Sequence, residues 1–243
     1  MGKTALVTGG SAGIGAGIAK RILSSLEEGD RLLVNYGHSE ETARAFLEGL
    51  PEEKRSLVEL IQADMSSEKG IDALLSALGE EKLTYLVCNT GISTKAKFED
   101  YTMEEWDHIV KTNLTVPTFL VQRLLPRMEQ GGSILFVGSY AGQQAYSASL
   151  VYGVTKAGIH FLTKSLVKET EKVGVRVNAI APGFIETRWH AGRSEESRER
   201  IEKKVALHRF GTVEEVADMA FAVLTNGYMN GSVVDIHGGY DYF

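Results

Sequence analysis

Short apolar runs alternate with longer amphipathic stretches along nearly the whole chain, and this alternation restricts the fold more than any other feature of the sequence. The apolar runs predict strands at residues 5–7, 31–36, 56–63, 83–88, 133–137, 175–180 and 232–236. The stretches between them predict helices at about 13–27, 39–49, 67–79, 102–128, 150–173 and 213–225. Because the strands are rich in Val, Leu and Ile, we expect both of their faces to be buried. The pattern therefore predicts an α/β fold with a parallel sheet between two layers of helices.

The length and composition fit one catalytic domain. With 243 residues and 43% hydrophobic content, the chain is long enough to bury a sizeable core, and no stretch has the composition of a linker. We therefore expect a single domain over residues 1–243. Residues 193–204 form a charged run, which predicts an exposed helix.

Charge and hydropathy exclude several classes of function. The 26 basic residues are outnumbered by 32 acidic ones, so we expect no nucleic-acid partner. No apolar run reaches the roughly 18 residues that a membrane span needs, and no signal-peptide pattern precedes the first strand, so we expect a cytoplasmic protein that does not enter a membrane. Cys88 is the only cysteine, which excludes an internal disulfide and argues against a Cys-rich metal site. We predict no metal, and we expect Cys88 to pack in the core.

A glycine-rich segment joins the first predicted strand to the first predicted helix. It consists of Thr8, Gly9, Gly10, Ser11, Ala12, Gly13, Ile14 and Gly15. Glycines at such a junction permit a tight turn and let the backbone approach a pyrophosphate, whose charge is favoured at a helix N-terminus. The spacing Gly-x-x-x-Gly-x-Gly differs from the common dinucleotide motif Gly-x-Gly-x-x-Gly. The alternative interpretation is that these glycines only turn a strand into a helix.

Tyr152 and Lys156 stand four residues apart in a predicted helix, so both side chains lie on one face. A tyrosine hydroxyl has a pKa of about 10, and a nearby cation lowers this pKa by stabilising the phenolate. The pair therefore predicts a tyrosine that acts as an acid or a base. The same spacing often arises by chance, and two surface residues of a helix are the alternative interpretation.

These residues, in their order and spacing, resemble the short-chain dehydrogenase/reductase family, specifically its single-domain branch. The resemblance covers essentially the whole chain and rests on the loop from Thr8 to Gly15, Asn89-Thr90-Gly91, Asn113, Ser139, Tyr152, Lys156 and Pro182-Gly183. The segment 230–239 looks like the last strand and turn of the 3-oxoacyl-[acyl-carrier-protein] reductase-like members. One departure is Cys88-Asn89-Thr90-Gly91, where the family more often has Asn-Asn-Ala-Gly. The resemblance implies a Rossmann-type doubly wound parallel sheet of about seven strands.

The resemblance also implies an NAD(P)-dependent oxidoreductase that interconverts a ketone and a secondary alcohol by hydride transfer, such as a reductase of 3-oxoacyl thioesters. A dehydrogenase of a sugar, a steroid or another small alcohol would also fit. A non-catalytic NAD(P)-sensing regulator is disfavoured because every catalytic position is filled. An epimerase or dehydratase of the extended branch would need a larger C-terminal substrate domain. The 3-oxoacyl-[acyl-carrier-protein] reductase-like members are commonly tetramers, so the resemblance implies a homotetramer or homodimer.

The resemblance assigns roles to four catalytic residues. Tyr152 is the general acid or base, and Lys156 lowers its pKa and hydrogen-bonds the nicotinamide ribose. The Ser139 hydroxyl polarises the substrate carbonyl, with a helix cap as the alternative role. The backbone carbonyl of Asn113 holds a water that relays protons to the lysine. Because Pro117 lacks an N–H group, the sequence itself predicts that this carbonyl is free, and a helix-interior Asn with a structural role is the alternative.

The resemblance also implies the cofactor contacts. The second strand ends at Tyr36, where NAD-preferring relatives place Asp, so nothing there repels a 2'-phosphate. Ser11, His38 and Ser39 are candidate donors to that phosphate, which favours NADP(H) over NAD(H), although the arginines that NADP-specific relatives often use are absent. His38 as a plain surface residue and Asp64 as a helix cap are alternatives. The expected contacts are Thr8, Gly9, Ser11, Gly13, Ile14, Gly15, Tyr36, His38, Ser39, Asp64, Met65, Asn89, Gly91, Tyr152, Lys156, Pro182, Gly183, Ile185 and Thr187.

The segment after the sixth strand predicts the substrate side of the site. Residues of about 184–212 are largely polar and are interrupted by Gly192, which fits a mobile lid. The candidate substrate neighbours, each of which is alternatively ordinary packing or surface, are Ile92, Ser93, Gln143, Tyr146, Trp189 and His190. The aromatic tail of Tyr240, Tyr242 and Phe243 either packs against a neighbouring subunit or folds back onto its own.

Overall fold

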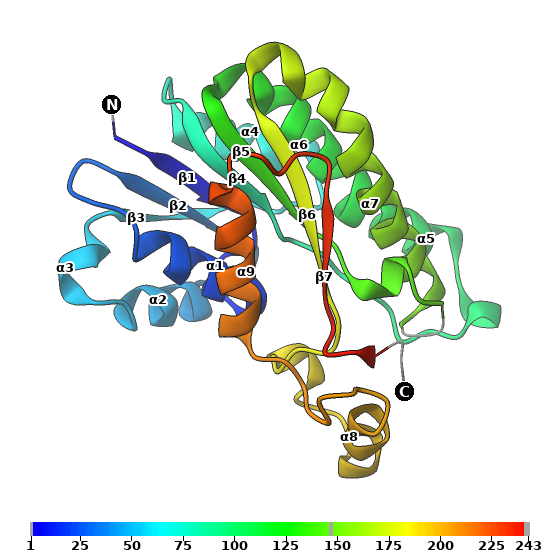
Figure 1. The fold of residues 1–243 in the computed structure, drawn as a ribbon. Coiled ribbons are helices and arrows are strands. Elements are labelled where there is room, and N and C mark those ends of the chain that lie inside the picture. The colour runs from blue at the N-terminus through cyan, green and yellow to red at the C-terminus, as the bar shows by residue number, and fades with distance from the viewer. Residues whose placement is uncertain (1, 146–147, 241–243) are drawn as a thin grey trace.

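The computed structural model describes residues 2–145 and 148–240. The strands within these residues form one seven-stranded parallel sheet (Figure 1). The strands are β1 (Thr4–Val7), β2 (Arg31–Tyr36), β3 (Val58–Gln62), β4 (Leu83–Cys88), β5 (Met128–Val137), β6 (Arg176–Pro182) and β7 (Val233–Ile236). Their order across the sheet is β3-β2-β1-β4-β5-β6-β7. The chain reverses its direction of winding between β1 and β4, and ligands of such sheets bind at the carboxyl ends of the strands near this switch point.

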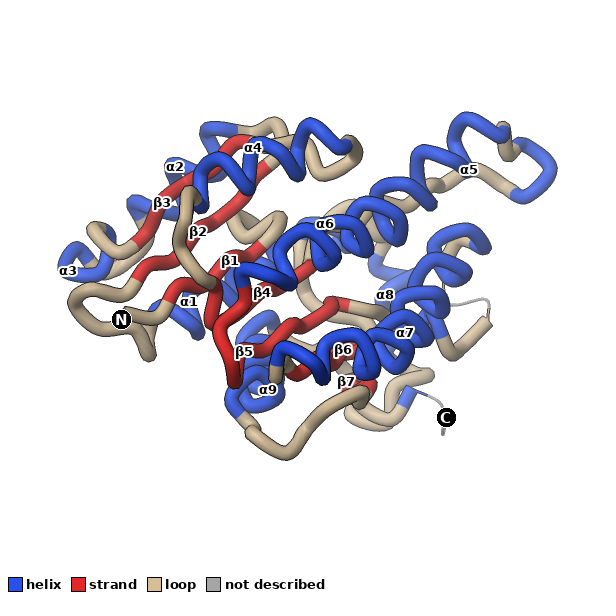
Figure 2. The backbone as a smooth tube through the Cα atoms, turned by 90° about the horizontal axis from the view of Figure 1, so that it is seen from above, coloured by secondary structure: helices blue, strands red, loops and turns tan. Residues whose placement is uncertain are grey.

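Helices cover both faces of the sheet, and Figure 2 shows the strands between the two helical layers. One layer contains α1 (Gly13–Leu23), α2 (Glu40–Glu48) and α9 (Val213–Thr225). The other contains α4 (Glu68–Leu78), α6 (Val116–Leu124) and α7 (Leu150–Thr170), with α5 (Met103–Val110) leading into α6. Two further helices are α3 (Glu52–Arg55) and α8 (Glu195–Glu202). The predicted α/β fold is confirmed.

Two hydrophobic clusters, one on each face, hold the helices against the sheet. Successive residues of a strand point to opposite faces, so Leu86 and Phe136 belong to the cluster beneath α4, α6 and α7. Their neighbours Val87 and Val137 belong to the cluster beneath α1, α2 and α9. The continuous apolar runs in the sequence are explained by this two-sided burial. Cys88 is buried in the first cluster, as expected.

The single helix predicted over 102–128 is wrong in one respect. α5 ends at Val110, and a π-helical turn, Lys111–Thr115, separates it from α6. The Val116 N–H donates to the Lys111 carbonyl five residues earlier, where an α-helix would bond residues four apart. Pro117, at the start of α6, has no N–H to continue the regular ladder, which is the physical reason for the interruption.

The other elements agree with the predicted ones to within a few residues, with two exceptions. β5 begins at Met128, five residues before the predicted start at 133, and α3 is a short helix that the sequence did not predict. The charged run at 193–204 forms α8, which is mostly exposed, as expected.

Asn35, near the end of β2, ties three segments together at the carboxyl edge of the sheet. Its Nδ2 donates to the carbonyl oxygens of Ile61 and Ala63 at 3.3 and 2.9 Å. Its Oδ1 accepts the Gly9 N–H at 3.1 Å, and the side chain is only 1% exposed. The amide therefore joins β2 both to β3 and to the glycine-rich loop after β1. Sequence reasoning singled out the neighbouring Tyr36 and missed this residue.

We expect Asn35→Ala to lower the free energy of unfolding by about 2–4 kcal/mol, because it removes the side-chain partner of the part-buried Gly9 N–H and of the buried Ala63 carbonyl. Urea unfolding followed by circular dichroism measures this change. Gln122→Ala, on the exposed side of α6, is the control and should change stability by less than about 0.5 kcal/mol. A loss below about 1 kcal/mol for Asn35→Ala would show that the amide does not hold these segments together.

Candidate active site

The glycine-rich loop between β1 and α1 has the backbone shape that a dinucleotide phosphate requires. Gly9 and Gly13 have φ values of +59° and +53°, in the left-handed region that favours glycine. A Cβ on Gly15 would lie 2.3 Å from the Gly9 carbonyl oxygen, so only glycine lets α1 approach the loop this closely. α1 begins without a side-chain cap or an acidic residue in its first turn, which suits an anion at its positive end. The loop therefore fits a pyrophosphate.

Asn89, directly after β4, holds the glycine-rich loop in this shape. Its Nδ2 donates to the carbonyl oxygens of Thr8 and Gly9 at 3.0 and 3.1 Å. The Thr8 hydroxyl oxygen accepts the backbone N–H groups of Asn89 and Thr90 at 2.9 and 3.2 Å. The loops after β1 and β4 are thus bonded in both directions, and the predicted cofactor residues Thr8 and Asn89 lie in contact.

The segment after β6 reaches the same loop. The Gly183 N–H, directly after Pro182, donates to the Ile236 carbonyl at 2.9 Å, and Ile185 is buried. A Cβ on Gly13 would lie 3.7 Å from the Thr187 side chain, so Thr187 faces the glycine-rich loop. Residues 8–15, 89 and 187 therefore come together, as the cofactor prediction requires. Ser11 and Ile14 lie in the same loop, each partly exposed.

Tyr152, Lys156 and Ser139 meet at the carboxyl end of β5. Tyr152 and Lys156 occupy the first two turns of α7, and the side chains of Ser139 and Tyr152 are hydrogen-bonded. Lys156 is only 4% exposed, and its Nζ donates to the Val137 carbonyl at 2.7 Å. Nζ also lies 5.5 Å from the centre of the Tyr152 ring and 3.5 Å from where a Cβ of Gly91 would stand. The structure thus groups three of the four predicted catalytic residues beside Gly91.

Burial changes the proton affinity of both side chains on this face of α7. Burial raises the pKa of Tyr152, and the hydrogen bond with Ser139 acts in the opposite direction. The net lowering of this pKa that the sequence predicts is therefore not found, because burial of the phenol has the larger effect. Burial also lowers the pKa of Lys156 to about 8. The phenol keeps its proton at neutral pH, which suits a general acid.

Asn113, the fourth predicted catalytic residue, lies in the π-helical turn. Its side-chain amide accepts the Ile92 N–H and donates to the Ile92 carbonyl, each at 2.8 Å, and it also donates to the Thr155 hydroxyl at 3.1 Å. The amide therefore fixes the segment after β4 against α7, which is a structural role. Since Pro117 has no N–H, the regular α-helical bond to the Asn113 carbonyl cannot form, as the sequence predicts, and a π-helical turn stands at this point of the predicted helix.

The residues predicted to surround a 2'-phosphate follow β2. Tyr36 ends the strand and is partly exposed, while His38 and Ser39 are exposed. Ser39 caps α2, since its hydroxyl oxygen accepts the Thr42 N–H at 3.2 Å and lies 2.8 Å from the Thr42 hydroxyl. The Ser39 hydroxyl is therefore occupied by the helix cap in this structure.

Sequence reasoning missed a cation in this region, Arg44. Its guanidinium pairs with Glu40 one turn earlier in α2 at 2.6 Å, and it interacts electrostatically with the Tyr36 phenol. A basic residue one helical turn after a predicted phosphate-binding segment is the signal that would have identified it.

Asp64, after β3, forms a turn and does not cap the next helix. Its carboxylate accepts the backbone N–H and the hydroxyl of Ser66 at 2.9 and 2.8 Å, and these bonds lower the pKa of Asp64. Ser67 is the residue that caps α4, by accepting the Gly70 N–H. The alternative interpretation of Asp64 as a helix cap is therefore wrong. Met65 is buried beside Thr8 in the wall of a small internal cavity.

The predicted lid, residues 184–212, extends beyond the carboxyl ends of the strands, with α8 standing away from the sheet (Figure 1). Its two ends are paired, because the Glu186 N–H donates to the Gly211 carbonyl at 2.8 Å and the Gly211 N–H donates to the Phe184 carbonyl at 2.9 Å. Arg198 of α8 pairs with Glu186 at 2.6 Å and lies over the Phe210 ring at 4.5 Å. These contacts hold α8 against the base of the segment.

Two of the predicted substrate neighbours are engaged with other side chains. The Ser93 hydroxyl lies 2.9 Å from the Ser149 hydroxyl, and Gln143 donates to Asp235 at 2.5 Å. Ile92 is held by Asn113 through its backbone.

Trp189 is a predicted substrate neighbour that lies beside Tyr152 of α7. Its ring centre lies 5.9 Å from that of Tyr152, and the side chain is 56% exposed. His190 ends the same short turn, Arg188–His190. Tyr146 lies outside the described residues.

The described part of the aromatic tail folds back onto its own chain. The Tyr240 ring packs 5.3 Å from Phe184 and 6.3 Å from Tyr140, the residue after Ser139. For Tyr240, the intramolecular alternative is therefore correct. Tyr242 and Phe243 lie outside the described residues.

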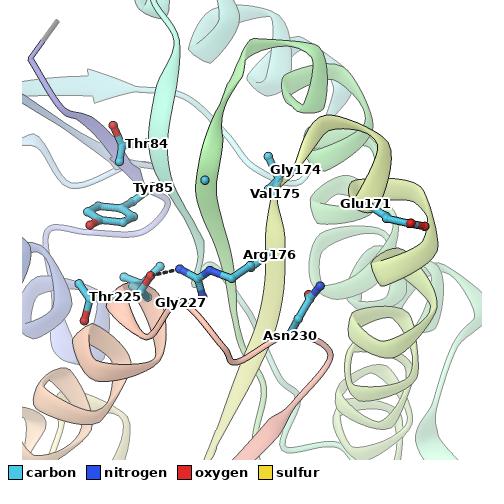
Figure 3. A pocket seen from close by; sticks show the side chains of 11 residues that line it. Thr84, Tyr85, Glu171, Gly174, Val175, Arg176, Thr225, Gly227 and Asn230 are labelled. Atoms are coloured by element: carbon cyan, nitrogen blue, oxygen red, sulfur yellow. Dashed lines mark hydrogen bonds between the residues drawn. The ribbon is translucent and has the colours of Figure 1, made fainter.

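A hollow of about 500 Å³ lies at the opposite, amino end of the sheet. Figure 3 shows Arg176 in this hollow, extending toward the end of α9. Its guanidinium donates to the carbonyls of Val223, Leu224 and Met229 at 3.4, 2.5 and 3.2 Å. Arg176 therefore caps the end of α9, and the hollow contains none of the predicted site residues.

In the part of the chain that the structure describes, no group of three or more His, Cys, Asp or Glu side chains is arranged to hold a metal ion. No helix within residues 2–145 and 148–240 is long and apolar enough to cross a bilayer.

Comparisons with known proteins agree on one kind of relative. The chain matches the family model described as Enoyl-(Acyl carrier protein) reductase over residues 9–241. It is 32% identical to the 3-oxoacyl-[acyl-carrier-protein] reductase FabG of Aquifex aeolicus, over 98% of this chain and 97% of that protein. It is similar to the Pseudomonas aeruginosa RhlG/NADP active-site complex, with a TM-score of 0.86, 32% identity, and coverage of 98% of this chain and 96% of that one. It is also similar to a short-chain dehydrogenase from Burkholderia cenocepacia in complex with NADP, with a TM-score of 0.86, 28% identity, and coverage of 99% and 98%.

We expect Lys156→Met to raise the free energy of unfolding at pH 7 by about 1–3 kcal/mol, because it removes a buried charge. The pKa of Lys156 falls from 10.5 in the unfolded chain to about 8 in the folded one. Between these values the unfolded state binds more protons, so the wild type gains stability as pH rises. The advantage of the variant should therefore fall below about 1 kcal/mol at pH 10.

Urea unfolding of both proteins at pH 7 and pH 10 measures this difference. Lys168→Met, at an exposed position of α7, is the matched control and should show no such pH-dependent difference. If Lys156→Met is less stable than the wild type at pH 7, the bond to the Val137 carbonyl outweighs the cost of burying the ammonium.

Proposed function

Since this chain belongs to the short-chain dehydrogenase/reductase family, we propose that it reduces a ketone to a secondary alcohol with NADP(H), and that the substrate is a 3-oxoacyl thioester or a similar carbonyl compound. The observation that carries this proposal is the meeting of Tyr152, Lys156 and Ser139 beside the glycine-rich loop and Gly91. A proton donor and a dinucleotide-binding loop at one edge of the sheet are what carbonyl reduction requires.

In the proposed reaction, Tyr152 donates its proton to the carbonyl oxygen of the substrate. The raised pKa of Tyr152 keeps the phenol protonated at neutral pH, as a general acid must be. The Ser139 hydroxyl, which is bonded to Tyr152, hydrogen-bonds the same oxygen and orients the carbonyl toward the phenol. When bound, NADPH supplies the hydride that adds to the carbonyl carbon. In the reverse direction Tyr152 accepts the proton of the alcohol.

Lys156 serves the same step in two ways. Its positive charge lies 5.5 Å from the centre of the Tyr152 ring and acts against the larger effect of burial when Tyr152 loses its proton. Its pKa of about 8 is close to neutrality, so Lys156 can return a proton to the phenolate. A water bonded to the Asn113 carbonyl would then replenish that proton, and the missing N–H of Pro117 keeps this acceptor out of the helical ladder.

The proposed cofactor is NADP(H), held by the residues that the fold brings to the loop. Thr8, Asn89 and Thr187 border the pyrophosphate and nicotinamide ends, as the resemblance implies. Tyr36 stands where NAD-preferring relatives place an aspartate, so no carboxylate there repels a 2'-phosphate, and Arg44 provides a cation nearby. The solved relatives from Pseudomonas aeruginosa and Burkholderia cenocepacia contain NADP, which supports the same choice.

The substrate proposal is supported by the relatives and by the lining of the site. The Aquifex aeolicus relative is a 3-oxoacyl-[acyl-carrier-protein] reductase. Trp189 provides an exposed aromatic surface beside Tyr152, against which an apolar acyl chain can pack. We propose that the segment 184–212 closes over such a substrate, with α8 held by the pair of Arg198 and Glu186. This reaction is proposed to take place in the cytoplasm.

A self-associating surface is proposed on α7. Leu150, Val154 and Phe161 recur at helical spacing, so they share one face, and all three side chains are exposed. A row of exposed apolar residues is typical of a contact between protein chains. We propose that this face binds a second copy of the chain in a homodimer or homotetramer.

We expect Tyr152→Phe to lower kcat at least about 1000-fold, because the variant lacks the proton donor, while the dissociation constant of NADPH changes less than about threefold. The assay follows oxidation of NADPH or NADH with a panel that includes a 3-oxoacyl thioester, a sugar ketone and a steroid ketone. Turnover of the thioester with NADPH in the wild type is the expected result. If no carbonyl compound is reduced, or if Tyr152→Phe is as active as the wild type, the proposed function is wrong.

We expect Phe161→Glu to shift the protein from an oligomer to a smaller species, because Phe161 is 74% exposed in the single chain and a charge there cannot be buried between copies. Sedimentation velocity measures the change in mass. Phe161→Leu keeps an apolar side chain and should remain oligomeric. An oligomer that survives Phe161→Glu would assign the contact to another surface.

A further inference from the structure

His160 is a buried titratable group that the proposed reaction does not use. It lies on α7 one turn after Lys156 and is only 7% exposed. Its Nε2 lies 3.4 Å from the backbone nitrogen of Ser139 and accepts the N–H of that residue. The imidazole is therefore bonded to the main chain of a residue that orients the substrate in the proposed reaction.

The backbone around Ser139 is closely fitted to this ring. A Cβ on Gly138 would lie 2.4 Å from the His160 Nε2, and a Cβ on Gly142 would lie 3.0 Å from Cε1. The distance at Gly138 is too short for a real side chain, so this glycine leaves room for the imidazole, while a Cβ on Gly142 would lie 2.7 Å from the backbone of α7. The Ser139 side chain also accepts the Ala141 N–H at 3.1 Å, which closes the turn that these glycines bracket. The turn thus rests on the face of α7 that His160 occupies.

The surroundings keep the imidazole neutral. Burial lowers the pKa of His160 to about 4, the charges of Lys156 and Lys164 act in the same direction, and the carboxylate of Asp235 opposes them. A neutral imidazole has one nitrogen with a free lone pair, and Nε2 must be that nitrogen if it accepts the Ser139 N–H. A protonated ring would instead present an N–H to an N–H, next to the charge of Lys156.

We propose that His160 is a positioning residue, which accepts the Ser139 N–H through neutral Nε2 and so holds the Ser139 hydroxyl in line with Tyr152. The proposal rests on the proposed function for its effect on turnover. The hydrogen bond from the Ser139 N–H to Nε2 of His160 does not depend on the proposed function. Loss of the acceptor should loosen the turn over residues 138–142 and weaken orientation of the substrate, while the glycine-rich loop after β1, which Asn35 and Asn89 hold, is unaffected.

Two variants separate the acceptor from the size of the side chain. His160→Leu fills similar space but cannot accept a hydrogen bond, whereas His160→Gln offers its amide oxygen at a reach close to that of Nε2. We expect His160→Leu to increase the exchange rate of the Ser139 amide at least about tenfold and to lower kcat about tenfold or more, with the NADPH dissociation constant within about twofold of wild type. His160→Gln should recover both properties to within about threefold. His108→Leu, at an exposed position of α5, is the matched control.

Hydrogen–deuterium exchange of the peptide that contains Ser139 gives a readout that does not depend on activity. If exchange in His160→Leu equals that in the wild type, or if His160→Gln behaves like His160→Leu, the proposal is overturned. If the wild type reduces no carbonyl compound, the proposed function fails while the exchange result still decides whether His160 holds Ser139.

A measurement on the wild type covers the case in which the variants do not fold. Nitrogen-15 NMR of histidine distinguishes a protonated from an unprotonated Nε2. We expect Nε2 of His160 to be unprotonated and unchanged between pH 8 and pH 5.5. A protonated Nε2, or titration within this range, would contradict the assigned bond.

Discussion

The buried ammonium of Lys156 is the constraint around which the site is arranged. Removing a charge from water costs free energy, and here one main-chain carbonyl, that of Val137, is the protein group bonded to it. This bond ties the start of α7 to the end of β5, which brings Tyr152 beside Ser139. Gly91 lies beside this ammonium, since a Cβ on that residue would stand 3.5 Å from Nζ. Burying the Lys156 ammonium lowers the stability of the fold, and the chemistry proposed for the site depends on the same burial.

Asparagine side chains connect the loops that surround this charge. Asn35 joins β2 and β3 to the glycine-rich loop, Asn89 joins that loop to β4, and Asn113 joins the segment after β4 to α7. An amide can both donate and accept: Asn35 and Asn113 do both, and Asn89 donates to two carbonyls of the glycine-rich loop. The backbone at the carboxyl edge of the sheet is thereby held in place without regular secondary structure, and a dinucleotide and a carbonyl substrate can share one rigid surface.

Local patterns made the fold predictable, whereas features that depend on distant contacts were missed. The strand period and the glycine-rich loop are properties of neighbouring residues, and Pro117 marks the interruption of the helix directly. The direction of the Tyr152 pKa was wrong because helical spacing shows that two side chains share a face, not that burial of the phenol has the larger effect. Asn35 and His160 escaped notice for the same reason, since their partners lie on segments far away in the sequence.

In the proposed reaction, the substrate carbonyl receives a hydride from the dinucleotide and a proton from Tyr152. Reduction of a ketone substrate with NADPH deuterated at C4 of the nicotinamide, followed by NMR of the alcohol, tests this most directly. We expect one deuterium on the carbinol carbon in ordinary water, and none on that carbon when unlabelled NADPH reacts in heavy water. Deuterium that reaches the carbon from the solvent would contradict direct hydride transfer in this site.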